Sequence, residues 1–263
     1  MPPFHANLVS VQTMSTPPRL AWITGASSGI GRALALQLAR DGWRVAVSAR
    51  NAEALTALAA ETTGIVGVPL DVTDEGAVTR AVEAIEAAHG PIALAVLNAG
   101  THERMTAEDF SLPTLRRLMD LNFMGVAHAL AALLPRMRAR GAGHLAVVAS
   151  LAGYRGLPTA GAYCASKAAL IALCESLRPD CDRLGITLQV VNPGFVETPL
   201  TARNSFAMPF LMPVERATRA FARGLGTRRF EIVFPWRFAM LMKLARALPY
   251  RLYFALVKRT TRA

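Results

Sequence analysis

Short apolar runs alternate with longer amphipathic segments along most of the chain. Runs of five or six apolar residues are typical of buried strands, and apolar residues spaced three or four apart are typical of helices. Strands are therefore predicted at 20–24, 43–48, 65–70, 92–97, 144–149, a run ending at 193, and 230–233. Helices are predicted at 32–40, 52–61, 74–89, 106–119, a segment ending near 140, 163–184 and 214–224. This alternation predicts an α/β protein with a parallel, doubly wound sheet of seven strands and helices on both faces.

The two ends of the chain depart from this pattern. Residues 1–18 carry paired prolines at both ends and are predicted to form a disordered tail, with Met14 as an alternative start. Residues 19–234 hold the alternating strands and helices and form the predicted main domain. Residues 235–263 make a third region, which is rich in basic and apolar residues.

The tail after residue 234 concentrates the positive charge. It carries seven basic residues and no acidic one, so only +4 of the net charge of +11 remains on the rest of the chain. On helical projections, one apolar face gathers Phe238, Leu241, Leu244, Leu248, and a second gathers Tyr250, Tyr253, Phe254, Val257. Two basic amphipathic helices are predicted, which pack on the main domain, contact a partner subunit, or lie on an anionic membrane surface. Nucleic-acid binding is disfavoured, because these aromatic residues are not interleaved as a stacking platform.

Length and cysteines limit the class of protein. With 263 residues, 52% of them hydrophobic, the chain can bury a substantial core. Cys164, Cys174 and Cys181 fall in one predicted helix, without a Cys-x-x-Cys pair or a Cys/His cluster of zinc spacing, so no metal site is predicted. No apolar run reaches about 18 residues. These features predict reduced thiols and a cytoplasmic protein, with peripheral membrane contact through the tail as the open alternative.

A glycine-rich loop joins the first predicted strand to the first predicted helix. Its sequence is Gly25-Ala-Ser-Ser-Gly29-Ile-Gly31. Gly25 permits a tight turn, Gly29 lets the backbone approach a diphosphate, and Gly31 allows the helix to pack on the strand. The N–H groups at the start of the helix would then face the anion. The alternative, a purely structural turn, is disfavoured by three glycines within seven residues.

The end of the second predicted strand bears on the choice of dinucleotide. An acidic residue there binds the adenosine ribose of NAD, whereas a basic residue accepts the extra phosphate of NADP. Ser48, Ala49 and Arg50 occupy this position, and Arg50 favours NADP(H) over NAD(H), although it can also be a solvated loop arginine. Asp71, after the third strand, is a candidate for binding an adenine amine or for capping the next helix. Asn98-Ala-Gly100 closes the fourth strand, at the edge where such sheets bind ligands.

The pair Tyr163 and Lys167 carries the candidate chemistry. The two residues are about one helical turn apart on one face, and an ammonium beside the phenol would lower its pKa and suit it for general acid/base work. By itself, such a pair is more typical of a solvated helix face. Asn122 lies among apolar residues, either as a satisfied buried amide or as the holder of a functional water. Ser150 follows the fifth predicted strand.

The combined motifs resemble the short-chain dehydrogenase/reductase family, in its single-domain branch, over residues 20–233. The motifs that carry the resemblance are Thr24-Gly-Ala-Ser-Ser-Gly-Ile-Gly31, Asp71, Asn98-Ala-Gly100, Asn122, Ser150, Tyr163-x-x-x-Lys167, and Pro193-Gly194 with Thr198. The resemblance implies a Rossmann-like catalytic domain. It also implies a dinucleotide site formed by Gly25, Ser27, Ser28, Gly29, Ile30, Gly31, Arg50, Asp71, Val72, Asn98, Ala99, Gly100, Tyr163, Lys167, Pro193, Gly194, Val196 and Thr198.

The resemblance also implies a role for each catalytic residue. Ser150 would bind the substrate oxygen, Tyr163 would exchange a proton with it, and Lys167 would lower the tyrosine pKa and hold the nicotinamide ribose. Asn122 would position a water that links Lys167 to solvent. The resemblance favours a homodimer or homotetramer, in which the helix from Tyr163 contributes to subunit packing. Pro179 departs from this picture, because it should kink or end that helix.

Two functional hypotheses follow. The first is an NADP(H)-dependent oxidoreductase that transfers a hydride between the nicotinamide and a carbonyl or secondary alcohol. The second is a non-catalytic protein that senses dinucleotides on the same fold, which has no need of the tyrosine. The segment 199–213 occupies the family's substrate-covering position and carries Leu200, Phe206, Met208, Phe210, Leu211 and Met212. It is predicted either to cover an apolar substrate or to pack as an ordinary loop. His102 is given little role in substrate contact.

Overall fold

Seven parallel strands form one sheet, in the order β3-β2-β1-β4-β5-β6-β7. The computed structural model describes residues 19–204 and 208–260, so the tail predicted at 1–18 and Phe206 lie outside the described residues. The strands are β1 Leu20–Thr24, β2 Arg44–Ala49, β3 Ile65–Pro69, β4 Ile92–Leu97, β5 Gly143–Val148, β6 Ile186–Pro193 and β7 Glu231–Phe234. Each lies within two residues of its prediction, and the predicted doubly wound architecture is confirmed.

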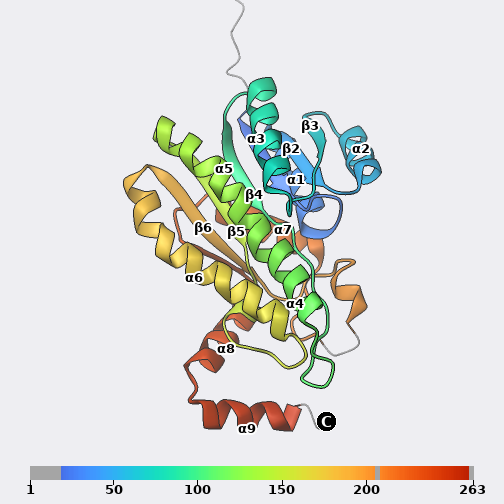
Figure 1. Ribbon diagram of the computed structural model, residues 1–263, viewed down its shortest axis with the longest axis vertical. Helices are drawn as coiled ribbons and strands as arrows, with labels where there is room; N and C mark the ends of the chain where they lie inside the picture. Colours follow the sequence, from blue (N-terminus) through green and yellow to red (C-terminus); the bar gives the residue numbers. More distant parts are fainter. Residues whose placement is uncertain (1–18, 205–207, 261–263) are drawn as a thin grey trace, which may run out of the picture.

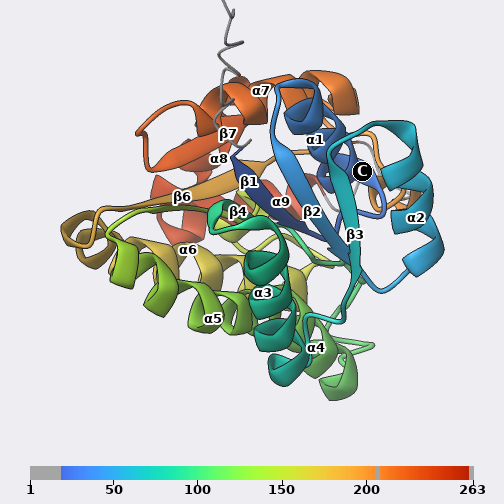
Figure 2. The same ribbon diagram turned by 90° about the horizontal axis from the view of Figure 1, so that it is seen from above.

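Helices cover both faces of the sheet (Figure 2). The α-helices of the described residues are α1 Gly29–Arg40, α2 Ala52–Glu61, α3 Glu75–His89, α4 Leu112–Met119, α5 Gly125–Arg140, α6 Gly161–Arg183, α7 Val214–Leu225, α8 Trp236–Ala247 and α9 Tyr250–Thr260. Helices α1, α2 and α7 bury their apolar residues in one cluster with the sheet, whereas α3, α5, α6 and α8 contribute to a second cluster. The strand order reverses between β1 and β4, so the connections that follow these two strands run to opposite faces of the sheet and leave the crevice where such sheets bind ligands.

The segment before α4 corrects one predicted boundary. A helix was expected from residue 106, but α4 begins only at Leu112. The hydroxyl of Ser111 accepts a hydrogen bond from the amide of Thr114 and caps the helix there. Upstream, the amide of Met105 donates to the carbonyl of Thr159 at 2.8 Å, which holds the segment as an extended loop against the start of α6.

Two helical segments contain irregular features. Between α4 and α5, residues Asp120–Met124 form a π-helical turn, η1, that contains Asn122. Helix α6 continues through Pro179 to Arg183, close to the predicted end at 184, so of the two expected effects of this proline, a kink or an end, the end is wrong. Cys174 and Cys181, on either side of this proline, are both buried, so the helix packs against the core before and after it. All three cysteines carry free thiols.

The tail forms two helices at one end of the molecule (Figure 1). Helix α8 packs Phe238, Ala239 and Met242 against the body, and α9 lies across its end. The apolar face predicted for α8 is wrong in part, because Phe238 is buried whereas Leu241 and Leu244 are exposed. Likewise, Tyr253 is buried on α9 whereas Phe254 is exposed. Each tail helix therefore presents apolar residues to two sides.

Candidate active site

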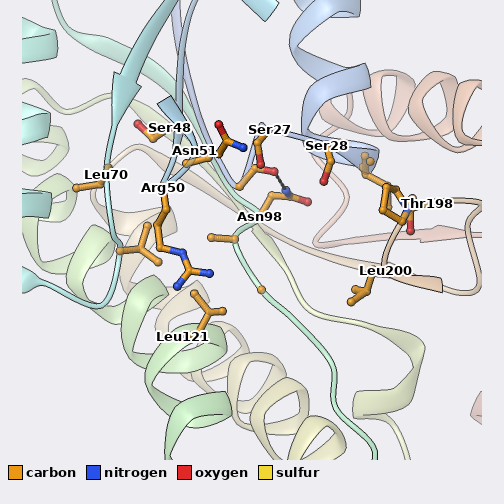
Figure 3. Close-up of a pocket in the computed structure, with 18 of the residues that line it drawn as sticks. Ser27, Ser28, Ser48, Arg50, Asn51, Leu70, Asn98, Leu121, Thr198 and Leu200 are labelled. Atoms are coloured by element: carbon orange, nitrogen blue, oxygen red, sulfur yellow. Dashed lines mark hydrogen bonds between the residues drawn. The ribbon is translucent and has the colours of Figure 1, made fainter. Parts of the chain in front are cut away.

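The glycine loop folds as the sequence predicts, for steric reasons that the structure makes explicit. Gly25 and Gly29 adopt φ of +66° and +56°, in the left-handed region that favours glycine. A β-carbon on Gly31 would lie 2.5 Å from the carbonyl oxygen of Gly25 and 2.6 Å from the side-chain nitrogen of Asn98. Gly31 therefore packs behind the loop and lets α1 start close to β1. The amino end of α1 faces the cavity in front of the loop (Figure 3).

Asn98 ties the end of β4 to the glycine loop. Its side-chain amide donates hydrogen bonds to the carbonyls of Thr24 and Gly25, each at 3.1 Å. The hydroxyl of Thr24 accepts from the amides of Asn98 and Ala99 at 3.0 and 3.1 Å. Thr24 is buried, and this role in fixing the loop was not predicted for it. Asn98 is thus a structural brace of the loop as well as a residue of the cavity wall.

A cavity of about 340 Å³ lies at the carboxyl edge of the sheet, in front of this loop (Figure 3). Twelve of the residues predicted to bind the dinucleotide line it, namely Gly25, Ser27, Ser28, Gly29, Ile30, Arg50, Asp71, Val72, Asn98, Ala99, Gly100 and Thr198. Seven further lining residues were not in the predicted dinucleotide site, namely Ser48, Ala49, Asn51, Leu70, Leu121, Pro199 and Leu200. Of these, Ser48 and Ala49 were noted at the end of the second strand, and Leu200 in the substrate-covering segment. The predicted residues Gly31, Tyr163, Lys167, Pro193, Gly194 and Val196 lie outside this lining.

Arg50 extends from the end of β2 into the cavity, toward Leu121 (Figure 3). Ser48, next to it on the strand, is buried, and its hydroxyl accepts a hydrogen bond from the indole of Trp22 at 3.0 Å. Asp71 accepts from the amide and hydroxyl of Thr73 at 3.0 and 2.8 Å. Burial opposes the change, but these hydrogen bonds and the nearby Arg50 lower the pKa of Asp71. The cavity therefore holds a cation beside an ionised carboxylate.

Ser150 and Tyr163 come from the end of β5 and the first turn of α6. The Ser150 hydroxyl accepts a hydrogen bond from the amide of Ala152 at 3.1 Å and donates to the carbonyl of Pro193 at 3.4 Å. Burial raises the pKa of Tyr163, and a hydrogen bond with Ser150 opposes that increase. The expected lowering of the tyrosine pKa by Lys167 is therefore wrong for this arrangement, because burial dominates.

Lys167 is buried and points back into the sheet. Its ammonium donates to the carbonyl of Val148 at 2.8 Å and lies 5.8 Å from the centre of the Tyr163 ring. Burial lowers the pKa of Lys167 to about 8. A β-carbon on Gly100 would lie 3.3 Å from this nitrogen, so the lysine adjoins the wall of the cavity.

Asn122 is a satisfied buried amide. Its side-chain oxygen accepts from the amide of Thr101 at 2.8 Å, and its nitrogen donates to the carbonyl of Thr101 and the hydroxyl of Ser166. Of the two interpretations that the sequence left open, a satisfied buried amide or the holder of a functional water, the first describes this side chain. Asn122 links the segment after β4 to α6, one residue from Lys167, and so supports the position of the lysine.

His102, for which only a small role in substrate contact was expected, stands beside the tyrosine. Its ring meets that of Tyr163 edge to face, with centroids 5.0 Å apart. Among the described residues, its buried Nδ1 finds no hydrogen-bond partner. Burial lowers the pKa of His102, although Glu103 opposes this, and the neutral imidazole is favoured. The only available signal was its position two residues after Asn98-Ala-Gly100.

The segment after β6 turns along the far side of the cavity. The amide of Gly194 donates to the carbonyl of Phe234, and Val196 is buried and pairs with Met212. Thr198 lies against Gly29, since a β-carbon on that glycine would be 3.2 Å from the threonine methyl. Of the predicted apolar covering residues, Met212 is buried, whereas Phe210 and Leu211 are exposed. The segment therefore combines ordinary packing with an exposed apolar edge.

Comparison with known proteins agrees with this geometry. A family model described as short chain dehydrogenase matches residues 19–208. An uncharacterised oxidoreductase of Myxococcus xanthus is 42% identical over 245 residues, which cover 92% of this chain and 97% of that protein.

Two solved structures with similar folds carry different dinucleotides. A short-chain dehydrogenase of Burkholderia cenocepacia in complex with NADP has a TM-score of 0.80 at 25% identity, over 92% of this chain and 98% of its own. A short-chain dehydrogenase/reductase of Burkholderia phymatum in complex with NAD has a TM-score of 0.79 at 25% identity, over 87% and 93%. The glycine loop, the sheet order and these matches together establish that the chain belongs to the short-chain dehydrogenase/reductase family of oxidoreductases.

Proposed function

We propose that this protein is an NADP(H)-preferring oxidoreductase that interconverts a carbonyl group and a secondary alcohol, with Tyr163 as the general acid/base. The observation that carries the proposal is the grouping of Ser150, Tyr163 and Lys167, in which Lys167 lies behind Gly100 of the cavity lining. A protein that only senses dinucleotides needs the glycine loop but not this grouping. The proposal therefore assigns a reaction rather than binding alone.

The cavity fits a dinucleotide. Gly25, Gly29 and Gly31 leave room that a β-carbon would fill or strain, and the amino end of α1 offers unpaired N–H groups to a diphosphate. The cation of Arg50 lies at the other end of the same cavity. When bound, a nicotinamide dinucleotide supplies or accepts the hydride, so the protein has to provide position and proton transfer.

Each polar side chain then has a defined task. Because its pKa is raised, Tyr163 is protonated at neutral pH, which is the form that donates a proton to a carbonyl oxygen. Ser150 shares a hydrogen bond with the tyrosine and can hold the same oxygen. Lys167, with a pKa near 8, is largely charged at neutral pH and favours negative charge nearby. Asn122 acts as a positioning residue through Ser166 and Thr101.

The preference for NADP(H) rests on Arg50. Its guanidinium lies in the cavity at the end of β2, where an acidic residue would disfavour a phosphate, and Ser48 beside it is already bonded to Trp22. An Arg50→Asp variant should lose its preference for NADPH over NADH, because a carboxylate repels the additional phosphate. Competitive titrations with the two dinucleotides measure this, and an unchanged ratio would contradict the assignment.

The substrate is proposed to be apolar. Leu200 lines the cavity, and Phe210 and Leu211 stand exposed on the segment that follows β6. A panel of ketones and alcohols of increasing apolar size, assayed with NADPH and NADH, tests this class. Small polar substrates that outperform every apolar one would count against it.

Tyr163→Phe is the decisive variant for the reaction. Loss of a general acid/base lowers turnover by about 10²- to 10⁴-fold, whereas the phenyl ring keeps the packing against His102. Steady-state oxidation of NADPH with the best ketone measures turnover, and titration calorimetry checks that the dinucleotide still binds. Tyr250→Phe, at an exposed tyrosine, is the matched control and should retain full activity. Wild-type turnover in Tyr163→Phe would refute the proposed role.

A further inference from the structure

The two tail helices carry most of the exposed apolar side chains. Of the fourteen large hydrophobic residues that are most exposed in the described chain, eight lie on α8 and α9. We call these the tail surface, and they are Trp236, Met240, Leu241, Leu244, Tyr250, Leu252, Phe254 and Leu256, each between 51 and 69% exposed. Soluble monomers rarely expose so many neighbouring apolar residues without a partner.

These residues are additional to the ones that anchor the helices. Phe238, Ala239 and Met242 bury the inner side of α8, and Phe238 stacks on Phe195 and Phe210. Tyr253 is the buried residue of α9, and its hydroxyl donates to the carbonyl of Gly156. The helices therefore hold their place through one side, and the tail surface is a second side that faces outward.

The charge of the tail restricts what can cover it. From residue 235 onward the sequence has seven basic residues and no acidic one. Lys243 pairs with Glu231 of β7, whereas Arg237, Arg251 and Lys258 are exposed around the tail surface. Two copies of this chain joined through the surface would bring like charges together at an apolar contact, which is unfavourable. An occupant that is both apolar and negatively charged fits better.

We propose that α8 and α9 bind the surface of an anionic lipid bilayer, with both helices lying in the interface plane. Aromatic side chains such as Trp236 and Tyr250 are favoured at the boundary between head groups and acyl chains. The leucines and Phe254 would enter the acyl region, and each basic residue near an anionic head group strengthens binding. Glu231 already neutralises Lys243, so the other cations make the larger contribution.

The helices are too short to cross the membrane. They have 12 and 11 residues, and a spanning helix needs about 20. The continuous helical segment Leu112–Arg140 is long and apolar enough to cross a membrane, by length and composition alone. Its α5 part, however, buries Val126, Leu130 and Leu133 in the core beside the sheet. The contact proposed here is therefore peripheral, and the sheet remains outside the bilayer.

The tail surface is connected to the candidate active site. Arg155 lies between Ser150 and Tyr163 in sequence and places its guanidinium 4.4 to 4.5 Å from the ring centres of Tyr250 and Tyr253. It also donates to the carbonyls of Arg246 and Leu248 at 3.1 and 3.3 Å. The bilayer would thus lie beside the segment that joins Ser150 to Tyr163.

Vesicle sedimentation with the full-length protein tests the proposal. The wild type should sediment with vesicles of phosphatidylglycerol and phosphatidylcholine at low salt. It should sediment much less with vesicles of phosphatidylcholine alone, or with the mixed vesicles in about 0.5 M salt, where the Debye length falls to a few ångströms. The double variant Leu244→Glu with Phe254→Glu should lose the binding. Leu184→Glu is the matched control, because Leu184 is an exposed leucine at the C-cap of α6, and it should bind like the wild type.

A second pair of changes separates charge from apolar contact. Arg251→Gln with Lys258→Gln removes two cations and should weaken binding to anionic vesicles by about 30-fold, at roughly fivefold per residue. All variants should keep the circular dichroism spectrum and melting temperature of the wild type, because the changed residues are exposed.

Light scattering without vesicles tests the rival occupant, a second copy of the chain. We expect the mass of the Leu244→Glu, Phe254→Glu variant to equal that of the wild type. A smaller mass in this variant would overturn the proposal in favour of a subunit interface. Failure of the wild type to bind anionic vesicles would overturn it as well, and neither outcome affects the proposed proton transfer by Tyr163.

Discussion

The glycine loop and the tail surface obey different constraints. Around the loop, Gly31 has no space for a side chain and Asn98 uses its amide to hold two carbonyls, so the local geometry dictates the residue types. On the tail, Leu244 and Phe254 are exposed, and the ring contacts of Phe254 are with Tyr250 and Tyr253 of its own helix, so the main domain does not determine either residue. Residue types required by packing within the main domain indicate the fold and the cofactor site, whereas exposed apolar residue types that this packing does not require indicate a binding partner.

The largest expected effect is at Gly31. Replacement by alanine would place a β-carbon 2.5 Å from the carbonyl oxygen of Gly25. Overpacking of this kind costs about 1–3 kcal/mol, and the displaced loop should also lose dinucleotide affinity. Urea unfolding and dinucleotide titration measure the two effects. Gly226→Ala is the control, because its nearest neighbour would be at an ordinary 3.5 Å and its φ is −72°, so it should change stability by less than about 0.5 kcal/mol.

Lys167 gives the next largest effect, through pH. Burial lowers its pKa from 10.5 to about 8, so between these values the unfolded chain binds more protons and stability rises with pH. Relative to Lys167→Met, which lacks the titrating group, the wild type should gain about 2 kcal/mol in unfolding free energy from pH 7.5 to 9.5. Urea unfolding of both proteins at the two pH values measures this difference. A difference that stays constant over this range would mean that the lysine is solvated in the folded state.

Arg155 ties the segment between Ser150 and Tyr163 to the tail helices, and its removal should loosen only the tail. Arg155→Met loses contacts with the Tyr250 and Tyr253 rings and hydrogen bonds to two carbonyls at the end of α8. We expect a loss of about 1–2 kcal/mol in the local stability of α9. Hydrogen exchange of the α9 amides should accelerate while that of the sheet stays unchanged. Arg104→Met, at an exposed arginine on the loop before α4, should leave α9 as it is. Equal acceleration in the sheet would mean that the tail is part of one cooperative unit.

The sequence predicted the strands and the glycine loop because each depends on a local requirement, whereas the full set of twelve cavity residues came from the family resemblance. Apolar runs have to be buried, and positive φ or a close approach requires glycine. It could not predict that burial would raise the Tyr163 pKa, because the burial of the phenol depends on how distant elements pack around it. For the same reason it placed Phe238 and Leu241 on one face, although the sheet buries only the first. The start of α4 was missed because Met105 pairs with a segment more than fifty residues away.

His102 lies beside the candidate catalytic residues but is not fully satisfied by internal contacts, and its replacement should have the smallest effect on stability. Its Nδ1 is buried without a partner among the described residues, whereas its ring packs on Tyr163. His102→Phe keeps an aromatic edge-to-face contact and removes the unsatisfied nitrogen, so the protein should become more stable by about 1 kcal/mol. His144→Phe is the matched control with the opposite sign, because Nε2 of His144 bonds to the buried Gln189 at 2.7 Å and its loss leaves that amide oxygen unpaired. Urea unfolding of both variants decides the matter. If His102→Phe is destabilising to the same degree as His144→Phe, then Nδ1 has a bound partner, and His102 belongs with the residues that internal geometry fixes.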